Sequence, residues 1–190
     1  PQFLTACLKE VLDEETIVID ETITNAPVVA KHLPRTKPGT YLANGGAALG
    51  FSGGAAIGVK LAHPDKTVVS LMGDGSYYFS IPSTVHWMAR RYQTPFLTVI
   101  YNNQGWNATK QNVLYLYKRG AAEELDTYWV DFQQPSDLAK IAEAAGGAYA
   151  RTVTKPAELK EALLKGLEEV KGGRSAVIDV RLAPIARHPR

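Results

Sequence analysis

The chain has 190 residues, of which 45% are hydrophobic, and its 21 lysines and arginines against 19 aspartates and glutamates give a net charge of +2. This length suits one sizeable core, so we predict a single domain over residues 1–190. The basic residues are scattered along the chain, which argues against nucleic acid as a partner. The single cysteine, Cys7, excludes an internal disulfide and fits a reducing intracellular compartment, either the cytoplasm or an organelle such as the mitochondrion.

The sequence also lacks the features of a membrane or secreted protein. No apolar stretch approaches the roughly 20 residues that span a bilayer, and the N-terminus has no signal-peptide pattern. We therefore expect no membrane partner. The chain begins at Pro1, without methionine, in a segment patterned as a helix. This start predicts a fragment or an excised domain of a longer protein.

The first forty residues predict a helix, a buried strand, a second helix and a loop. Apolar residues at helical spacing indicate a helix over residues 3–13, and residues 16–20 have the continuous apolar character of a buried strand. Asn25 is suited to cap a short helix that extends to Leu33. Residues 34–40 are rich in proline, glycine and basic residues, so we expect a loop there.

A glycine-rich stretch follows at residues 44–58, with six glycines among fifteen residues. Each glycine costs about 1 kcal/mol relative to alanine inside a helix, so an ordinary core helix does not explain the pattern. Two interpretations stay open: close approach of the backbone to a ligand, or a tightly packed helix start against the sheet. The two commonest nucleotide-binding glycine loops are absent.

The middle of the chain predicts a β-α-β unit. Residues 67–72 indicate a strand, Pro82 opens a helix that runs through Tyr92, and residues 96–101 indicate the next strand. We expect a parallel pair with a right-handed crossover. The following stretch, residues 106–131, is the least regular part of the sequence and is typical of a lid or a partner-facing loop.

The last third alternates helices and strands. Ser136 is suited to cap a helix that ends at Gly146-Gly147, residues 148–153 indicate a strand, Pro156 opens another helix, and residues 176–180 form the last strand. The whole pattern predicts an α/β fold: a doubly wound, Rossmann-like, mostly parallel sheet of about six strands with helices on both faces.

Polar residues follow both strands of the β-α-β unit. They are Gly73-Asp74-Gly75-Ser76 and Asn102-Asn103-Gln104-Gly105. Ligands bind beyond the carboxyl ends of parallel strands, and oxygen donors there suit Mg²⁺ or Ca²⁺. One carboxylate is too little for an all-protein cage, so a diphosphate bridged by Mg²⁺ meets the remaining needs. Taken alone, the Gly-Asp-Gly group also fits a simple turn.

The two groups, 25 residues apart, resemble the cofactor signature of thiamine diphosphate-dependent enzymes of the acetolactate synthase and pyruvate decarboxylase superfamily. The similarity extends over nearly the whole chain and matches the C-terminal domain, which holds the cofactor diphosphate. It implies that Asp74 and Asn103 ligate Mg²⁺ by their side chains and Gly105 by its backbone carbonyl. It also implies a diphosphate site formed by Gly73, Gly75 and Ser76.

The resemblance further implies how the rest of the cofactor is held. Leu49 corresponds to the bulky residue that props thiamine diphosphate in its bent form, and the carbonyl of Ala47 to the acceptor for its aminopyrimidine group. The family's catalytic glutamate lies on a pyrimidine-binding domain, usually of a second subunit, and this chain has no counterpart. We therefore expect no catalytic residue here, half of an active site, and a homodimer or homotetramer in the complete enzyme.

Departures from the family pattern bear on the reaction. Residues 80–84 lack the Gln-Glu pair that is usual at this point in acetolactate synthases. Residues 103–109 resemble benzaldehyde lyase-like carboligases as much as they resemble acetolactate synthases. The leading expectation is an acetolactate synthase-like lyase or carboligase acting on a 2-oxo acid. The alternatives are a 2-oxo acid decarboxylase, or a benzaldehyde lyase-like carboligase acting on aldehydes. From other classes, a non-catalytic binding module that dimerises through its tyrosine-rich segment and a nucleotide-binding domain also stay open.

Three histidines and a tryptophan outside these motifs carry side chains that can serve in catalysis or binding. His86 lies in mid-helix, where packing is a commoner role than catalysis. Trp106, directly after the second polar group, either lines the substrate pocket or packs in the core. His32 and His63 lie in or near turns, and the sequence assigns them no role.

Overall fold

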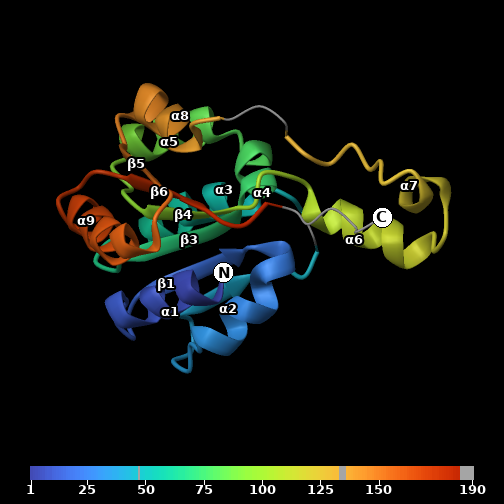
Figure 1. The fold of residues 1–190 in the computed structure, drawn as a ribbon. Coiled ribbons are helices and arrows are strands. Elements are labelled where there is room, and N and C mark those ends of the chain that lie inside the picture. The colour runs from blue at the N-terminus through green and yellow to red at the C-terminus, as the bar shows by residue number, and fades with distance from the viewer. Residues whose placement is uncertain (47, 133–135, 185–190) are drawn as a thin grey trace.

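The computed structural model describes residues 1–46, 48–132 and 136–184 (Figure 1). Within these residues, six parallel strands form one sheet in the order β2-β1-β3-β4-β6-β5. The strands are β1 (Ile17–Glu21), β2 (Tyr41–Ala43), β3 (Val68–Gly73), β4 (Leu97–Asn102), β5 (Tyr149–Val153) and β6 (Ala176–Arg181). The chain runs outward from β1 to β2 and then returns to β3 on the other side of β1. The order of the strands therefore reverses between β1 and β3.

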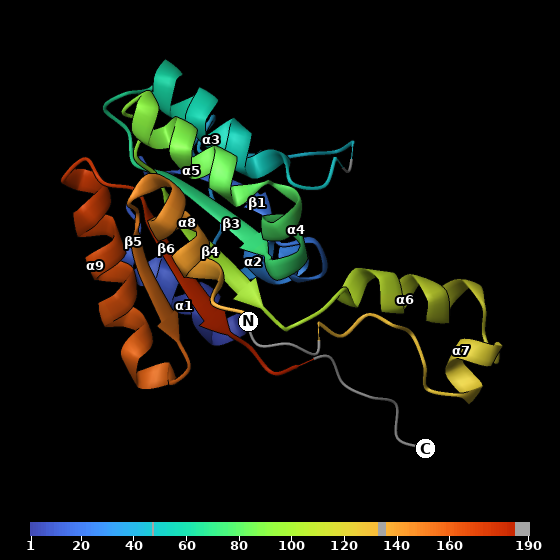
Figure 2. The same ribbon diagram turned by 90° about the horizontal axis from the view of Figure 1, so that it is seen from above.

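Helices cover both faces of this sheet. On one face α1 (Gln2–Val11), α2 (Ala26–His32) and α9 (Leu159–Lys171) bury a large apolar cluster against the strands. The other face is covered by α3 (Phe51–Ala62), α5 (Pro82–Arg91) and α8 (Leu138–Gly146), which Figure 2 shows lying over the sheet. The predicted doubly wound α/β fold is confirmed, and the β3-α5-β4 crossover joins neighbouring parallel strands as expected.

Two short helices project from this body. The stretch predicted to be irregular contains α6 (Asn107–Leu116) and α7 (Ala121–Glu124), which extend away from the sheet in both views (Figures 1 and 2). The irregular interpretation was therefore wrong for α6. Its sequence gave no helical signal because only Lys110 of its side chains is buried, so apolar residues have no reason to recur on one face.

Three local predictions need correction. The strand β2 was missed because it has three residues, none of them buried. Asn25 occupies the N-cap position of α2, but within the described chain its side chain makes no capping hydrogen bond. Asp137, not Ser136, precedes α8, and the Ser136 hydroxyl is hydrogen-bonded to the Tyr78 hydroxyl at 2.6 Å.

The remaining elements are short. They are α4 (Asp74–Phe79) and the 3₁₀ turns η1 (Ile23–Asn25) and η2 (Pro156–Glu158). Of the helices in the described ranges, none is long and apolar enough to cross a membrane. Both α4 and η1 begin at the carboxyl end of a strand, which places them at the edge of the sheet where the polar residues gather.

Candidate cofactor site

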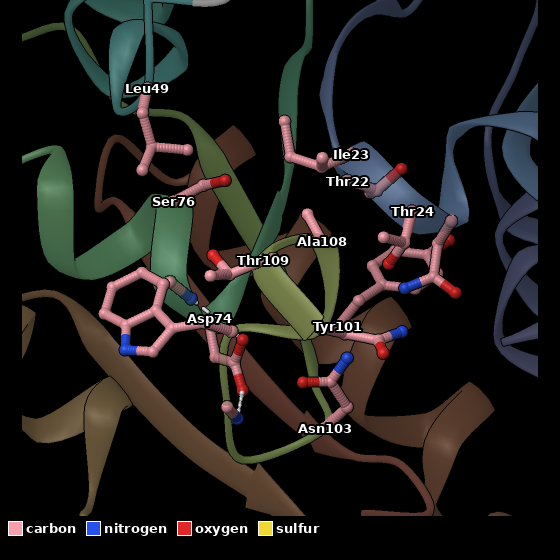
Figure 3. Close-up of a pocket in the computed structure, with 16 residues that line it drawn as sticks. Thr22, Ile23, Thr24, Leu49, Asp74, Ser76, Tyr101, Asn103, Ala108 and Thr109 are labelled. Atoms are coloured by element: carbon pink, nitrogen blue, oxygen red, sulfur yellow. Dashed lines mark hydrogen bonds between the residues drawn. The ribbon is translucent and has the colours of Figure 1, made fainter. Parts of the chain in front are cut away.

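A cleft of about 100 Å³ opens at the carboxyl ends of β1, β3 and β4, where the order of the strands reverses. Open α/β sheets bind ligands at such a switch point. Figure 3 shows Leu49 and Ser76 on one side of the cleft and Thr22 and Thr24 on the other. The structure brings together seven of the predicted site residues in its lining: Leu49, Gly73, Asp74, Gly75, Ser76, Asn103 and Gly105. The eighth, Ala47, lies outside the described residues.

Asp74 is the first residue of α4 and is 3% exposed. Its Oδ1 accepts a hydrogen bond from the Gly75 N–H at 2.8 Å, and its Oδ2 accepts from the N–H groups of Gln104 at 2.6 Å and Gly105 at 3.1 Å. Burial raises the pKa of Asp74 to about 6, and these three bonds oppose the shift. A carboxylate offers about four acceptor positions, so the described residues leave one position on Oδ1 for a further partner.

Asn103 follows β4 and lines the same cleft. Its Oδ1 is buried and has no hydrogen-bond partner among the described residues. An unsatisfied buried acceptor costs about 1–3 kcal/mol and calls for an explanation such as a ligand or ion. Asp74 and Asn103 therefore present two oxygen atoms with spare acceptor capacity to one cleft.

The preceding asparagine, Asn102, has a different role. Its Nδ2 donates to Asp179 Oδ1 at 2.8 Å, and its Oδ1 accepts from the Gln104 N–H at 3.0 Å. The structure thus separates the two asparagines, with Asn103 in the cleft lining and Asn102 bonded to the buried Asp179 and to the backbone of Gln104. Asp179 was missed at the sequence level, although a carboxylate inside an otherwise apolar strand was a usable signal.

The start of α3 is held by Glu21, at the end of β1. This side chain is 3% exposed, and its two carboxylate oxygens accept the N–H groups of Gly50 and of Ser52, the latter at 2.9 Å. Gly50 has φ +89°, and a Cβ there would lie 2.5 Å from the Phe79 carbonyl carbon. This arrangement turns the chain so that the half-exposed Leu49 lines the cleft.

The glycine-rich stretch contains both tightly packed and open glycines. A Cβ at Gly53 would lie 3.1 Å from the Val85 side chain, so this glycine permits close packing of α3 on α5. A Cβ at Gly54 or Gly58 would meet nothing within 4 Å. Tight packing of the helix start is therefore found at Gly50 and Gly53, but its nearest contacts are with Phe79 of α4 and Val85 of α5 and not, as predicted, with the sheet. No single interpretation explains all six glycines.

The turn after β1 forms the opposite wall of the cleft. Asp20 accepts hydrogen bonds from the Thr22 N–H at 2.9 Å and hydroxyl at 2.7 Å, and from the Tyr41 hydroxyl at 2.7 Å. Ile23, which follows Thr22 in the chain, has φ +52°, an outlier for a residue with a β-branched side chain. Backbone strain of this kind gathers at functional sites, and no sequence pattern pointed to this turn.

Trp106 both lines the cleft and packs against aromatic rings. Its indole contacts Phe79 and Phe132 edge to face, with ring centroids 5.6 Å and 4.9 Å apart. A Cβ at Gly75 would lie 2.3 Å from the Trp106 ring, so only glycine fits at position 75 while the indole is there. Both interpretations of Trp106 thus describe part of its environment.

His86 lies away from the cleft. It is 2% exposed on α5 and stacks on Phe96 with ring centroids 5.4 Å apart. Burial lowers its pKa to about 4, so it is neutral at physiological pH. These surroundings match the packed role that its mid-helix position predicted.

The donor set of the cleft is oxygen-rich and weakly charged. The residues that the structure describes include no cluster of three or more histidines, cysteines or carboxylates that could hold a metal alone. A cation bound here would need amide and backbone oxygens together with oxygens of a ligand. That requirement is met by Mg²⁺ in complex with a phosphate compound.

The fold and cleft define an open parallel α/β domain with a polar site at its strand switch point. The family model described as "Thiamine pyrophosphate enzyme, C-terminal TPP binding domain" matches residues 22–180. The chain belongs to this family. The residues matched by the family model include every described residue of the cleft lining, from Thr22 to Thr109.

Similar proteins agree with this assignment. The chain is 30% identical over 181 residues to acetolactate synthase isozyme 3 large subunit of Escherichia coli, covering 95% of this chain and 30% of that protein. It is 30% identical to the chloroplastic acetolactate synthase of Arabidopsis thaliana, covering 86% of this chain and 24% of that protein. The chain thus spans about a third or less of the length of these relatives.

Solved structures share the fold. A thiamine diphosphate-dependent 4-hydroxybenzoylformate decarboxylase from Rhodococcus jostii superposes with a TM-score of 0.80 at 23% identity, covering 97% of this chain and 32% of that chain. Benzoylformate decarboxylase from Polynucleobacter necessarius superposes with a TM-score of 0.79 at 21% identity, covering 100% of this chain and 34% of that chain.

Proposed function

We propose that this chain holds the diphosphate of thiamine diphosphate through Mg²⁺ in the cleft beyond β1, β3 and β4. The observation that carries the proposal is the pair of buried oxygen donors there: among the described residues, Asp74 Oδ1 keeps one open acceptor position and Asn103 Oδ1 has no hydrogen-bond partner. Membership in the thiamine pyrophosphate enzyme family supports the cofactor. The oxygen-rich donor set supports Mg²⁺ as the metal.

The proposed metal ligands are the side chains of Asp74 and Asn103 and the carbonyl of Gly105. Among the described residues, that carbonyl accepts one hydrogen bond, from the Asn107 N–H at 3.1 Å, and a carbonyl oxygen has a second lone pair. Diphosphate oxygens and water would complete the octahedron that Mg²⁺ requires. One carboxylate is enough in this arrangement because the diphosphate supplies the remaining negative charge.

The diphosphate itself would lie against Gly73, Gly75 and Ser76, at the start of α4. The Ser76 hydroxyl now donates to the Glu21 carbonyl at 3.2 Å, a long bond that a phosphate oxygen can replace. Leu49 would support the bend of the cofactor, and the Ala47 carbonyl would accept its amino group. When bound, thiamine diphosphate supplies the electron sink for carbonyl chemistry. The residues of this chain anchor and orient it.

The proton chemistry of the cofactor would depend on a glutamate outside this chain. None of the described residues that line the cleft is a glutamate. Glu21 lies nearby, but its two carboxylate oxygens are bonded to the start of α3. We therefore assign no catalytic residue here and propose a pyrimidine-binding domain, of the same or another subunit, as the partner.

Exposed apolar side chains near the cleft support such a partner. Phe79 and Ile81 are 59% and 61% exposed at the end of α4, and large apolar side chains are also exposed on the projecting α6–α7 segment. The relatives are about three times longer than this chain, which leaves ample sequence for a covering domain. In a homodimer or homotetramer, either the same subunit or its neighbour could supply it.

Calorimetry on the 190-residue chain tests the cofactor proposal. Titration with thiamine diphosphate should give a binding isotherm in Mg²⁺ and none in EDTA. The Asp74→Ala variant should lose the Mg²⁺-dependent binding, while the surface variant Lys140→Ala should retain it. Equal binding by wild type and Asp74→Ala would refute the metal site. Stronger protection against heat by ADP or NAD than by thiamine diphosphate would favour a nucleotide-binding domain instead.

For the complete enzyme we propose acetolactate synthase-like lyase or carboligase activity on a 2-oxo acid such as pyruvate. The acetolactate synthases among its relatives support this substrate class. The second candidate is 2-oxo acid decarboxylation, which the absence of the Gln-Glu pair at residues 80–84 favours. Supplying pyruvate to the full-length enzyme separates them, because the first yields acetolactate and the second acetaldehyde. Turnover by this chain alone would contradict its assignment as half of a site.

A further inference from the structure

Asp179 is a fully buried carboxylate that is not among the described residues lining the cleft. It lies in β6, paired in register with Ile100 of β4 and Thr152 of β5. Burial of a carboxylate is costly unless hydrogen bonds or opposite charges compensate it. Arg181 Nη2 lies 3.4 Å from Asp179 Oδ2, yet this oxygen has no hydrogen-bond partner within the described ranges. The fold alone gives no reason to keep a carboxylate at this position.

The main contact of Asp179 is with Asn102. Asp179 Oδ1 accepts a hydrogen bond from Asn102 Nδ2 at 2.8 Å. An ionised carboxylate only accepts hydrogen bonds, whereas an asparagine amide has one donor end and one acceptor end. Asp179 therefore fixes the orientation of the Asn102 amide, because the flipped amide would bring its oxygen against the carboxylate.

The oriented amide in turn holds the loop that follows β4. Asn102 Oδ1 accepts from the Gln104 N–H at 3.0 Å, and Asp74 Oδ2 accepts from the same N–H at 2.6 Å. Gln104 has φ +65°, a left-handed conformation that is unfavourable for a residue other than glycine and must be held in place. This residue lies between Asn103 and Gly105, two of the proposed metal ligands.

We infer that Asp179 is a positioning residue for the metal site, acting through Asn102 on the Gln104 N–H and thereby on the loop of residues 103–105. The inference rests on the proposed function, because it assigns Asp179 a role toward the same Mg²⁺. Groups behind a metal ligand commonly change metal affinity by 10–100-fold when they are replaced.

The test uses Asp179→Asn in the full 190-residue chain. An asparagine at position 179 can donate as well as accept, so the Asn102 amide is no longer held in one orientation. At a fixed thiamine diphosphate concentration, the Mg²⁺ concentration for half-maximal binding should rise about 10-fold or more. Saturating Mg²⁺ should restore the binding, and the melting temperature should not fall. Asn102→Ala should raise the Mg²⁺ requirement similarly, and the double variant should be no worse than Asn102→Ala alone.

Hydrogen exchange at the Gln104 amide gives a second measurement, in the ligand-free chain. Asp179→Asn should lower the protection of this amide while the core strands keep theirs. The matched control is Thr98→Val, another buried polar position in the sheet, four residues before Asn102 on β4. It should change neither the Mg²⁺ requirement nor the Gln104 exchange.

The outcomes separate this inference from the proposed function. If Asp74→Ala abolishes Mg²⁺-dependent binding while Asp179→Asn leaves the Mg²⁺ requirement and the Gln104 exchange unchanged, the role of Asp179 is overturned and the metal site stands. If Asp74→Ala binds as wild type does, the metal site fails and the assigned role of Asp179 fails with it.

Discussion

The buried, neutral His86 predicts a specific loss of stability in mild acid. Its pKa falls from an ordinary value of 6.5 to about 4 in the folded chain, because burial disfavours the imidazolium. Below pH 6.5 the unfolded chain takes up a proton that the folded chain refuses. The contribution of His86 is therefore fully present above pH 6.5 and is lost as the pH falls toward 4. At 1.36 kcal/mol per pKa unit, the loss amounts to about 3 kcal/mol.

Asp74 changes the free energy of unfolding in the same pH range, with the opposite sign. Its pKa is raised from 3.8 to about 6, so between pH 6 and 4 the folded chain binds more protons than the unfolded chain. This carboxyl stabilises the fold as the pH falls, by a similar amount. The wild-type curve alone therefore conceals both contributions, and a difference between two variants is needed.

The measurement is urea denaturation of wild type and His86→Leu from pH 7.5 to pH 4.5, followed by circular dichroism. Leucine keeps an apolar contact with Phe96 and removes the titrating group. The stability of His86→Leu relative to wild type should rise by about 2–3 kcal/mol from pH 7 to pH 4.5. The exposed His63→Gln serves as the control for loss of a histidine. A difference curve that is flat across this range would refute the assignment of His86 as a buried neutral side chain.

Three further predictions concern close contacts. Gly146→Ala should destabilise the chain by about 3 kcal/mol, because its Cβ would lie 2.3 Å from the His86 carbonyl oxygen on α5. Gly54 in α3 faces open space, so Gly54→Ala should instead stabilise the chain by about 0.5–1 kcal/mol. If the urea midpoints of the Gly146→Ala and Gly54→Ala variants do not differ, the α5–α8 packing is contradicted. Glu21→Ala should lower stability by about 3 kcal/mol through loss of two bonds to a buried carboxylate, and Glu21→Gln by less, as thermal unfolding can show. Gly75→Ala should lower the free energy of unfolding strongly in the wild-type background and only slightly in the Trp106→Ala background. Equal losses of stability in the two backgrounds, measured by urea denaturation, would exclude the indole as the cause.

The regular elements of the fold could be predicted because burial leaves a period in the sequence. The strands β3, β4 and β6 are largely apolar runs buried on both faces, and α9 places six buried residues at helical spacing. In contrast, β2 and α6 bury almost nothing, so neither has a pattern to detect. The failed caps at Asn25 and Ser136 show that a suitable side chain can prefer another partner or none.

The candidate site was predictable where neighbouring strands place short motifs together. Asp74 and Asn103 follow strands that pair in register, so their meeting follows from the topology. The supporting residues were not predictable, because Glu21 bonds a loop 29 residues away and Asp179 an asparagine 77 residues away. Single carboxylates at such separations form no local motif, and only the packed fold reveals their partners.

Paramagnetic broadening by Mn²⁺, used in place of Mg²⁺, tests the central claim most directly. In the presence of thiamine diphosphate, substoichiometric Mn²⁺ should broaden the amide signals of residues 73–76 and 102–105 before any others, and Asn103→Leu should greatly weaken this effect. Broadening centred elsewhere on the chain, or unchanged in Asn103→Leu, would contradict a metal site built on Asp74 and Asn103.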